Sequence, residues 1–432
     1  MKNKAKLLLC ILLILSLALA LASCNKSKDE PNDVPSSDEK NPDKNDIVNP
    51  PNLGNGNGSV SISCAHDVQN GACTKCGIKE STAGLEFEEN ADGTYTLVGP
   101  GSCMEETLII GLYNNKEVTH IGKQALYEGR HLLNVTIEKC VESIGSYAFA
   151  YCTGIANLTL PNTITSIQRD AFVFAHIGSV HLTDLASWCN IEFAKESNWD
   201  YYSSNPLSAA QNLYVGGQLV TEVTIPNTVT KINPGAFMDF QGISCVKIPD
   251  SVTEIGAYAF DDCGQLKCVY MGSEVKKIGE RAFDKSGMEW FDAVHFTDIT
   301  NWCNVYIETP AISNPISFAK EVYINGNLIT KLVIPDGVTS IRSGVFYGNS
   351  FTEVVISDSV QTIGSQAFES SNCLSKFFCP DSVTTIGANA ISLSMWANCT
   401  LTIYCEATSQ PSGWDSQWTY LPGHTVVWGH KD

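Results

Sequence analysis

The sequence predicts a repeat solenoid rich in β-structure, preceded by a secretion signal and a short tether. One motif, Val-x-Ile-Pro followed by Val-Thr-x-Ile-Gly and Ala-Phe, recurs along most of the chain. The N-terminus combines lysines with a long apolar run, and the segment after it lacks aromatic residues. Apolar residues repeated at one spacing over most of a chain are typical of stacked coils that share an interior.

The first 23 residues are expected to be a signal peptide. Three lysines precede an apolar run from Leu7 to Leu21, and small residues follow it. This is the order of parts in a secretory signal, and the run is shorter than the roughly 20 residues that a spanning helix requires. An uncleaved membrane anchor is the alternative.

The segment Leu21-Ala22-Ser23-Cys24 resembles the lipobox of bacterial lipoproteins. In such proteins the cysteine is acylated and becomes the first mature residue, so the resemblance implies that Cys24 is the lipid attachment site. Acyl chains hold a protein on a membrane without spanning it. We therefore expect a location in the cell envelope, lipid-anchored and exposed outside the cytoplasmic membrane.

Composition limits the partners of the chain. Residues 24–61 are mainly polar, Gly and Pro, so they cannot bury enough apolar surface to fold, and we expect a disordered tether. The net charge is −19, whereas nucleic-acid binding requires a basic surface. We therefore expect no nucleic-acid partner, and contact with the membrane through the lipid anchor alone.

The repeat is stated most clearly by residues 223–237 and 246–260. Its recurrent isoleucine falls at Ile121, Ile144, Ile167, Ile232, Ile255, Ile278, Ile341, Ile363 and Ile386. Each Val-x-Ile segment is expected to form a short strand with its two apolar residues inward and the middle residue outward. Stacking of the coils would place these strands side by side in one long parallel sheet on one face, with short helical turns and loops on the other.

These motifs resemble the BspA-like class of leucine-rich repeats, in which Ile-Pro, Ile-Gly and Ala-Phe hold the same places. The resemblance covers residues from about 105 to 405. It implies a β-rich leucine-rich-repeat solenoid in a surface protein that contributes to adhesion to host matrix proteins or to other cells. The ligand does not transfer with the resemblance.

We divide the folded part into a Cys/His module at 62–80, a solenoid with its N-terminal cap at 81–405, and a C-terminal cap at 406–432. Two longer units, 184–221 and 298–331, interrupt the rhythm with a Trp-Cys-Asn segment, an Asn-Pro step and a hairpin around Gly-Gly or Asn-Gly. Such dipeptides supply the positive φ angles of two-residue turns. Trp188 and Trp302 are expected in the core, and Asp184 and Asp298 as helix caps.

A possible structural zinc site precedes the solenoid. Cys64-x-His66 and Cys73-x-x-Cys76 supply three thiolates and one imidazole, which suit a closed tetrahedral site. Metal binding would then provide the folding energy of this small module. The alternative is a disulfide with His66 incidental, since disulfides persist outside the cell.

A candidate ligand-binding face comes from the middle residues of the Val-x-Ile segments. Its central part combines long and aromatic side chains at Lys247, Tyr270, His295 and Tyr323. Exposed aromatic residues on a rigid face are typical of recognition, although ordinary cross-strand packing is the alternative. The complete predicted row is Thr136, Thr159, His181, Thr224, Lys247, Tyr270, His295, Tyr323, Val333, Val355, Phe378 and Thr402.

Cys245 and Cys268 fall at equivalent positions of successive repeats, so we expect neighbouring strands to bring them within disulfide reach. The motifs of common hydrolases, metalloproteases and nucleotide-binding enzymes do not occur in the sequence.

Together the observations favour a monomeric, non-catalytic surface lipoprotein that binds an extracellular protein or glycan. A carbohydrate-capturing lipoprotein, using the aromatic row and the terminal tryptophans Trp414, Trp418 and Trp428, and a structural surface-layer component without specific ligand are the alternatives.

Overall fold

A computed structural model describes residues 64–194, 204–285, 290–395, 397–419 and 424–431. The predicted signal peptide (1–23) and the whole predicted tether (24–61), which begins with Cys24, lie outside the described residues. Residues 63–432 cluster as one compact unit. Within the described ranges, no helix has the length and apolar character that a membrane crossing requires.

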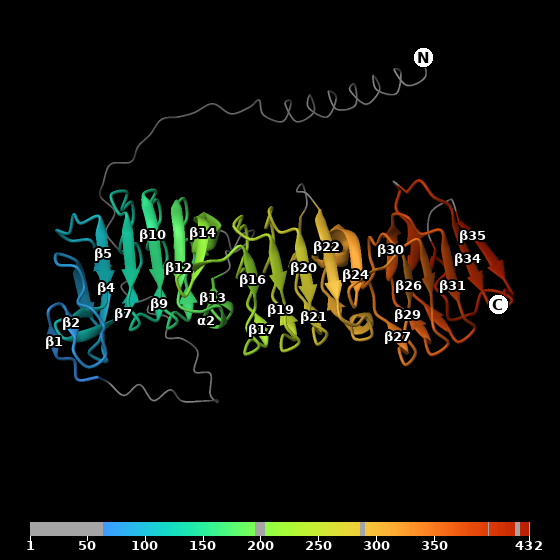
Figure 1. Cartoon of the computed structure of the whole chain (residues 1–432), viewed down its shortest axis with the longest axis horizontal. Coiled ribbons are helices and arrows are strands. Elements are labelled where there is room, and N and C mark those ends of the chain that lie inside the picture. The colour runs from blue at the N-terminus through green and yellow to red at the C-terminus, as the bar shows by residue number, and fades with distance from the viewer. Residues whose placement is uncertain (1–63, 195–203, 286–289, 396, 420–423, 432) are drawn as a thin grey trace, which may run out of the picture. The chain divides into compact units, whose positions relative to one another are not determined.

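The Val-x-Ile segments form parallel strands, as predicted, but in three sheets in series rather than one (Figure 1). We call these the primary sheets, and the three parts of the solenoid blocks 1, 2 and 3. The primary sheet of block 1 contains β5 (Thr107–Ile110), β8 (Asn134–Ile137), β10 (Ile155–Leu160), β12 (Ile177–Leu182), β14 (Ala210–Val215) and β15 (Gln218–Leu219). That of block 2 contains β16 (Glu222–Thr224), β18 (Cys245–Lys247), β20 (Cys268–Met271), β22 (Phe291–Phe296), β24 (Ala319–Ile324) and β25 (Asn327–Leu328). That of block 3 contains β26 (Lys331–Val333), β28 (Glu353–Val355), β31 (Lys376–Cys379), β34 (Leu401–Cys405) and β35 (His424–Trp428).

The recurrent isoleucines lie in a second set of strands, where the sequence predicted only turns. These secondary sheets run beside the primary sheets and use mostly two-residue strands. In block 1 they comprise β3 (Glu86–Glu89), β4 (Tyr95–Gly99), β7 (Lys116–Ile121), β9 (Ser143–Ile144), β11 (Ser166–Ile167) and β13 (Glu192–Phe193), with β6 (Leu112–Tyr113) paired to β7. In blocks 2 and 3 they comprise β17 (Lys231–Ile232), β19 (Glu254–Ile255), β21 (Lys277–Ile278), β23 (Tyr306–Ile307), β27 (Ser340–Ile341), β29 (Thr362–Ile363) and β32 (Thr385–Ile386).

Helical structure is sparse among the described residues. It consists of α2 (Leu185–Cys189), η1 (Pro206–Ala209), η2 (Trp302–Asn304), α3 (Pro310–Ser313) and η3 (Pro315–Phe318). Two small sheets complete the fold, one of β1 (Val68–Gln69) with β2 (Ala72–Cys73) and one of β30 (Phe368–Ser371) with β33 (Ile391–Leu393). Asp184 caps α2 by accepting a hydrogen bond from the Ser187 N–H, as predicted. Asp298 instead accepts from Thr300 in a turn ahead of η2, so it does not cap a helix.

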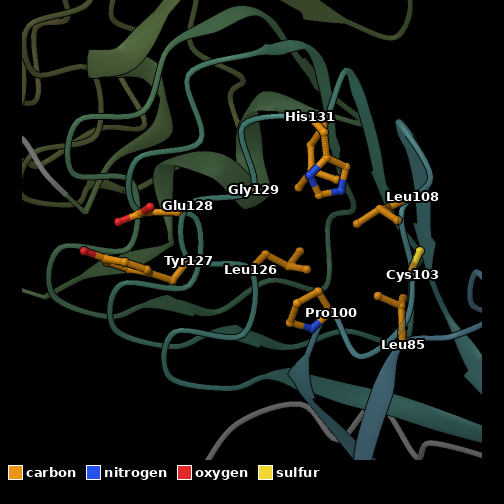
Figure 2. Close-up of a pocket in the computed structure, with 10 residues that line it drawn as sticks. Leu85, Pro100, Cys103, Leu108, Leu126, Tyr127, Glu128, Gly129 and His131 are labelled. Carbon is orange, nitrogen blue, oxygen red and sulfur yellow. The ribbon is translucent and has the colours of Figure 1, made fainter. Parts of the chain in front are cut away.

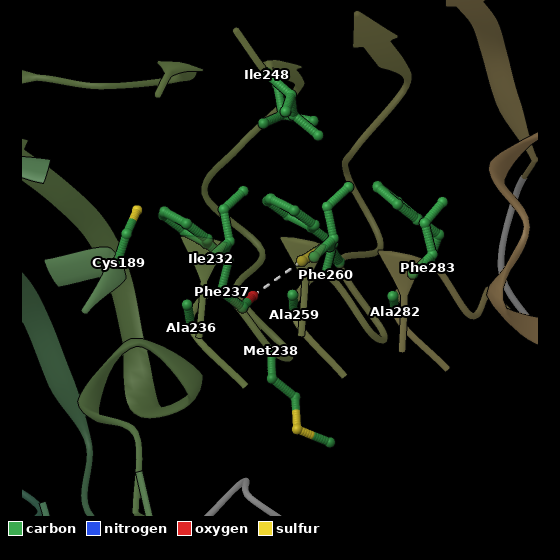
Figure 3. Close-up of a cluster of buried hydrophobic side chains, with 14 of the residues drawn as sticks. Cys189, Ile232, Ala236, Phe237, Met238, Ile248, Ala259, Phe260, Ala282 and Phe283 are labelled. Atoms are coloured by element: carbon green, nitrogen blue, oxygen red, sulfur yellow. Dashed lines mark hydrogen bonds between the residues drawn. The ribbon is translucent and has the colours of Figure 1, made fainter. Parts of the chain in front are cut away.

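The core consists of columns of identical residues from successive coils. Phe237, Phe260 and Phe283 are fully buried, and their rings stack with centroids 5.2 and 5.3 Å apart (Figure 3). This spacing is close to the distance between neighbouring strands, so each ring of the Ala-Phe motif rests on its counterpart in the next coil. The same close approach explains the Ile-Gly step, because a Cβ at Gly256 would lie 2.5 Å from the Pro234 nitrogen.

The two longer units join the blocks through buried polar contacts. The Trp188 indole N–H donates to the Ala236 carbonyl in the first coil of block 2, and the buried Asn205 amide donates to that carbonyl and to the one before it. Trp302 and Asn314 make the equivalent bonds to block 3. Both tryptophans are therefore core residues, as predicted, and the Asn-Pro steps are structural.

The C-terminal segment continues the primary sheet of block 3. Its strand β35 pairs in parallel register with β34 and thereby adds another strand to the primary sheet. Trp414 and Trp418 are buried against the last coils, and the Trp414 indole donates to the Val383 carbonyl. These two tryptophans cannot form the carbohydrate platform considered above.

Phe260 offers a direct test of the stacked core. We expect Phe260→Ala to lower the free energy of unfolding by about 3–5 kcal/mol, because it removes a fully buried ring with partners on both faces. Phe174→Ala is the control, since that ring is 68% exposed, and its cost should stay below about 1 kcal/mol. Urea unfolding followed by circular dichroism measures both, and equal losses would contradict the stacked interior.

The register of β18 and β20 generates a second prediction. Cys245 and Cys268 are direct partners in this parallel pair, as the repeat spacing predicted, and both are thiols in the structure. We expect oxidising conditions to join them, whereas the buried Cys152 and Cys263, whose thiols each donate to a backbone carbonyl, stay reduced. Peptide mapping after alkylation without reduction tests for this disulfide. Alkylation of both Cys245 and Cys268 would contradict it.

Candidate functional site

The predicted ligand-binding residues lie in one column on the primary sheet of block 2. Lys247 pairs with Tyr270, Tyr270 with His295, and His295 with Tyr323 in four successive parallel strands. Their side chains alternate with buried residues of the same strands, so they point away from the core. We call this column the ring ladder.

The rings of the ladder stack on one another. The Tyr270 and His295 centroids are 4.2 Å apart with planes 10° from parallel, and those of His295 and Tyr323 are 4.7 Å apart at 22°. On the other side of Tyr270, in strand β18, the Lys247 ammonium lies 5.8 Å from the centroid of the Tyr270 ring. Beyond Tyr323 the sheet continues with Leu328 of the hairpin strand β25. The rings of Tyr270 and His295 are therefore covered on both faces and present their edges outward.

The charged groups beside the ladder make local contacts with ladder residues. Lys247 forms an ion pair with Glu222 at 3.2 Å, and the Tyr323 hydroxyl donates to the Glu321 carboxylate. That hydrogen bond raises the pKa of Tyr323. Desolvation lowers the pKa of His295, which therefore favours the neutral imidazole within the stack.

A strip of small side chains runs alongside the ladder, two residues earlier in each strand. Cys245, Cys268 and Ala293 form its middle, and Glu222 and Glu321 stand at its two ends. The rings therefore border a low apolar strip that ends in a carboxylate on either side.

The other blocks carry shorter ladders. His181 stacks on Tyr214 at 4.7 Å in block 1, and Phe378 stacks on Tyr404 at 4.9 Å in block 3. Tyr214 is missing from the predicted row, although Leu213-Tyr-Val matches Val322-Tyr-Ile of the second hairpin. Tyr404, not Thr402, occupies the row in the last coil, because β31 pairs Phe378 with Tyr404 and Lys376 with Thr402.

The four predicted metal ligands come together before the solenoid. One ligand atom from each of Cys64, His66, Cys73 and Cys76 lies within 4.8 Å of the others. The β1–β2 hairpin positions Cys73, and the turn after it positions Cys76 and ends at Gly77, whose φ is +75°. Burial raises the pKa of the Cys73 thiol, but N–H groups of the Cys76 and Lys75 backbone and the His66 side chain outweigh it and lower the pKa to about 5.

A cavity of about 140 Å³ lies where the N-terminal strands meet the first coil (Figure 2). Its lining is mostly apolar: Leu85, Pro100, Cys103, Leu108, Leu126 and Leu132, with Tyr127, Glu128, Gly129 and His131. Binding pockets for small molecules generally have about 300–1,000 Å³ and several convergent polar groups. The cavity is too small for such a role, and we interpret it as imperfect packing at the end of the repeat array.

Comparison with known proteins identifies the repeat. A family model described as the BspA type leucine-rich repeat region matches residues 107–200, 210–303 and 316–409, with six copies. Comparison with curated proteins finds no match.

Several solved structures are similar to this chain. A leucine-rich repeat protein of Bacteroides ovatus is 16% identical, with 77% of this chain and 89% of that chain covered and a TM-score of 0.40. A leucine-rich cell surface protein of Faecalibacterium prausnitzii is 20% identical, with 78% and 96% covered and a TM-score of 0.31. The pneumococcal vaccine antigen PcpA is 14% identical, with 73% and 72% covered and a TM-score of 0.35.

The matched segments span more than half of the chain and contain strands of all three blocks. They begin with β5, contain the ring ladder and extend past β34. The chain belongs to the family of BspA type leucine-rich repeat proteins.

Proposed function

We propose that this protein is a non-catalytic surface lipoprotein that binds an extracellular protein through the ring ladder of block 2. The observation that carries the proposal is the column of Lys247, Tyr270, His295 and Tyr323 on a hydrogen-bonded sheet. Tyr270 is 40% exposed although its ring stacks on His295. A partner therefore meets side chains whose rotamers are already restricted, which reduces the entropy cost of binding.

The direction of the rings favours a protein over a glycan. Sugars stack on exposed ring faces, but the faces of Tyr270 and His295 are covered by neighbouring ladder members. The outward edges carry hydroxyl and imidazole groups, which suit hydrogen bonds to a polypeptide. Of the other candidate sugar platform, Trp414 and Trp418 are buried, and only Trp428 is partly exposed. Carbohydrate capture is therefore the second candidate, and a structural component without ligand is the third.

Charge indicates the chemistry of the partner. Glu222 and Glu321 flank the apolar strip beside the ladder, and the whole chain carries a net charge of −19. A protein segment with an apolar centre and a basic residue at the Glu321 end would complement this surface, since Glu222 at the other end already pairs with Lys247. Complementary charge raises association rates and weakens with salt, so binding should be salt-sensitive.

Attachment to the envelope completes the proposal. Cys24 would carry the acyl chains, and residues 25–61 would separate the solenoid from the membrane. Acyl chains and a polar tether would leave the primary sheets accessible to partners outside the cell.

Substitution of the ladder tests the binding function. We expect Tyr270→Ala with Tyr323→Ala to weaken binding to immobilised host matrix proteins at least about tenfold, because buried aromatic contacts dominate interface energies. Biolayer interferometry over matrix-protein and glycan panels, at low and physiological salt, measures the effect. Tyr306→Ala is the matched control, since Tyr306 is 42% exposed in the same block but lies in a secondary sheet.

Three outcomes would count against protein binding by the ladder. The double variant could bind as the unchanged protein does, or the Tyr306 control could lose as much affinity. Binding to glycans alone would favour the carbohydrate alternative. Circular dichroism must first show equal folding of all three proteins.

The anchor has its own test. We expect a bacterium that expresses the full chain and is fed a radiolabelled fatty acid to label it at Cys24. Cys24→Ala should remove the label and release the protein from the membrane fraction, whereas Cys103→Ala, which changes a buried solenoid cysteine, should retain both. Undiminished labelling of Cys24→Ala would exclude this residue as the attachment site.

A further inference from the structure

We propose that Cys64, His66, Cys73 and Cys76 bind one structural zinc ion that fastens the N-terminal module to the first coil of the solenoid. The cluster lies apart from the ring ladder, and the proposal does not depend on the binding function. It depends on the four clustered ligand atoms and on a fifth residue, Glu117, contributed by the solenoid.

The donor set suits zinc. Three thiolates and one imidazole are a common tetrahedral combination for structural zinc sites, and four protein ligands leave no open position for catalysis. The Cys64 and Cys73 sulfurs are 3.9 Å apart, and the Cys76 sulfur is 3.4 Å from His66 Nδ1. Such separations match the edges of a tetrahedron with metal–ligand distances of about 2.0–2.3 Å.

Glu117 determines which imidazole nitrogen faces the cysteines. His66 Nε2 lies 3.3 Å from the Glu117 carboxylate, and the His66 side chain is only 4% exposed. If Nε2 carries the proton and donates a hydrogen bond to Glu117, Nδ1 keeps its lone pair towards the three sulfurs. A carboxylate behind a histidine ligand is a frequent outer contact of zinc sites, where it fixes the tautomer.

These outer contacts connect two parts of the chain. Glu117 belongs to β7 of the secondary sheet, and Lys139, just after β8, donates from Nζ to the Cys76 carbonyl. The Leu112 N–H also donates to the Lys79 carbonyl. A metal ion bound by the module would therefore fix residues 64–80 against the first coil, which has no preceding repeat to cover it.

Metal content is the first measurement. We expect one zinc per chain by inductively coupled plasma mass spectrometry of purified protein, and a thiolate-to-cobalt charge-transfer band after replacement by Co²⁺. Cys76→Ser should lose both signals. Absence of metal from the reduced, zinc-supplied protein, or a Cys64–Cys73 disulfide under the same conditions, would overturn the proposal.

Glu117→Gln tests the link to the solenoid while keeping all four ligands. We expect it to bind one zinc about 10–100-fold more weakly in competition with a chromophoric chelator, because outer contacts tune metal affinity by this amount. Glu89→Gln is the matched control, since Glu89 of β3 pairs with Lys116, the residue before Glu117 in β7, and none of the hydrogen bonds or ion pairs described for Glu89 involves the four ligands. Equal zinc affinity for both variants and the unchanged protein would overturn the role of Glu117.

Hydrogen exchange locates the effect of the metal. Removal of zinc should accelerate exchange in residues 64–80 and in β7, and leave β18, β19 and β20 in block 2 unchanged. This locality follows because a repeat stabilises mainly its neighbours. Unchanged exchange in β7 would show that the ion does not fasten the module to the solenoid.

Discussion

Every part of this structure depends on one constraint, which is that a single coil cannot bury its own apolar edge. Burial requires the next coil to lie one strand spacing away, with the same kind of residue at the same height. The phenylalanine column at 237, 260 and 283 follows directly, and so does the glycine that follows six of the nine recurrent isoleucines. The repeat in the sequence therefore reflects translational symmetry of the interior.

The same symmetry has to be interrupted without exposing the interior. At the end of block 1 the hairpin strand β15 turns back on β14 and ends the primary sheet. The core nevertheless continues, because Trp188 and Asn205 satisfy carbonyl groups of the next coil. Buried polar groups are tolerated when they are hydrogen-bonded. The longer units thus interrupt the backbone pairing of the primary sheets, while side chains preserve contact between the blocks.

Fold class, repeat register, both hairpins and the core tryptophans could be predicted from the sequence, because each depends on spacing along the chain. The three separate sheets could not, since the sequence indicates a hairpin but not where its strand ends the pairing. Two-residue strands such as β9 are too short to produce a periodic signal. The Val-x-Ile pattern predicts Thr402 in the outward row, but β34 pairs with β31 two residues further along, so Tyr404 lies there instead. Glu117 lies 51 residues from His66 in the sequence, so no local motif could associate them.

Alignment of equivalent residues also explains why a binding surface can arise on this fold. A strand spacing that stacks phenylalanines inside equally stacks Tyr270, His295 and Tyr323 outside. Exterior positions are free of packing demands, so a change at one of them alters the surface without altering the coil. Block 1 has Thr136 and Thr159 in the column where block 2 has Lys247 and Tyr270, yet both blocks keep the same backbone pattern. Variation of the surface on such a scaffold therefore resides in the outward residue of each strand, and stability resides in its two inward neighbours.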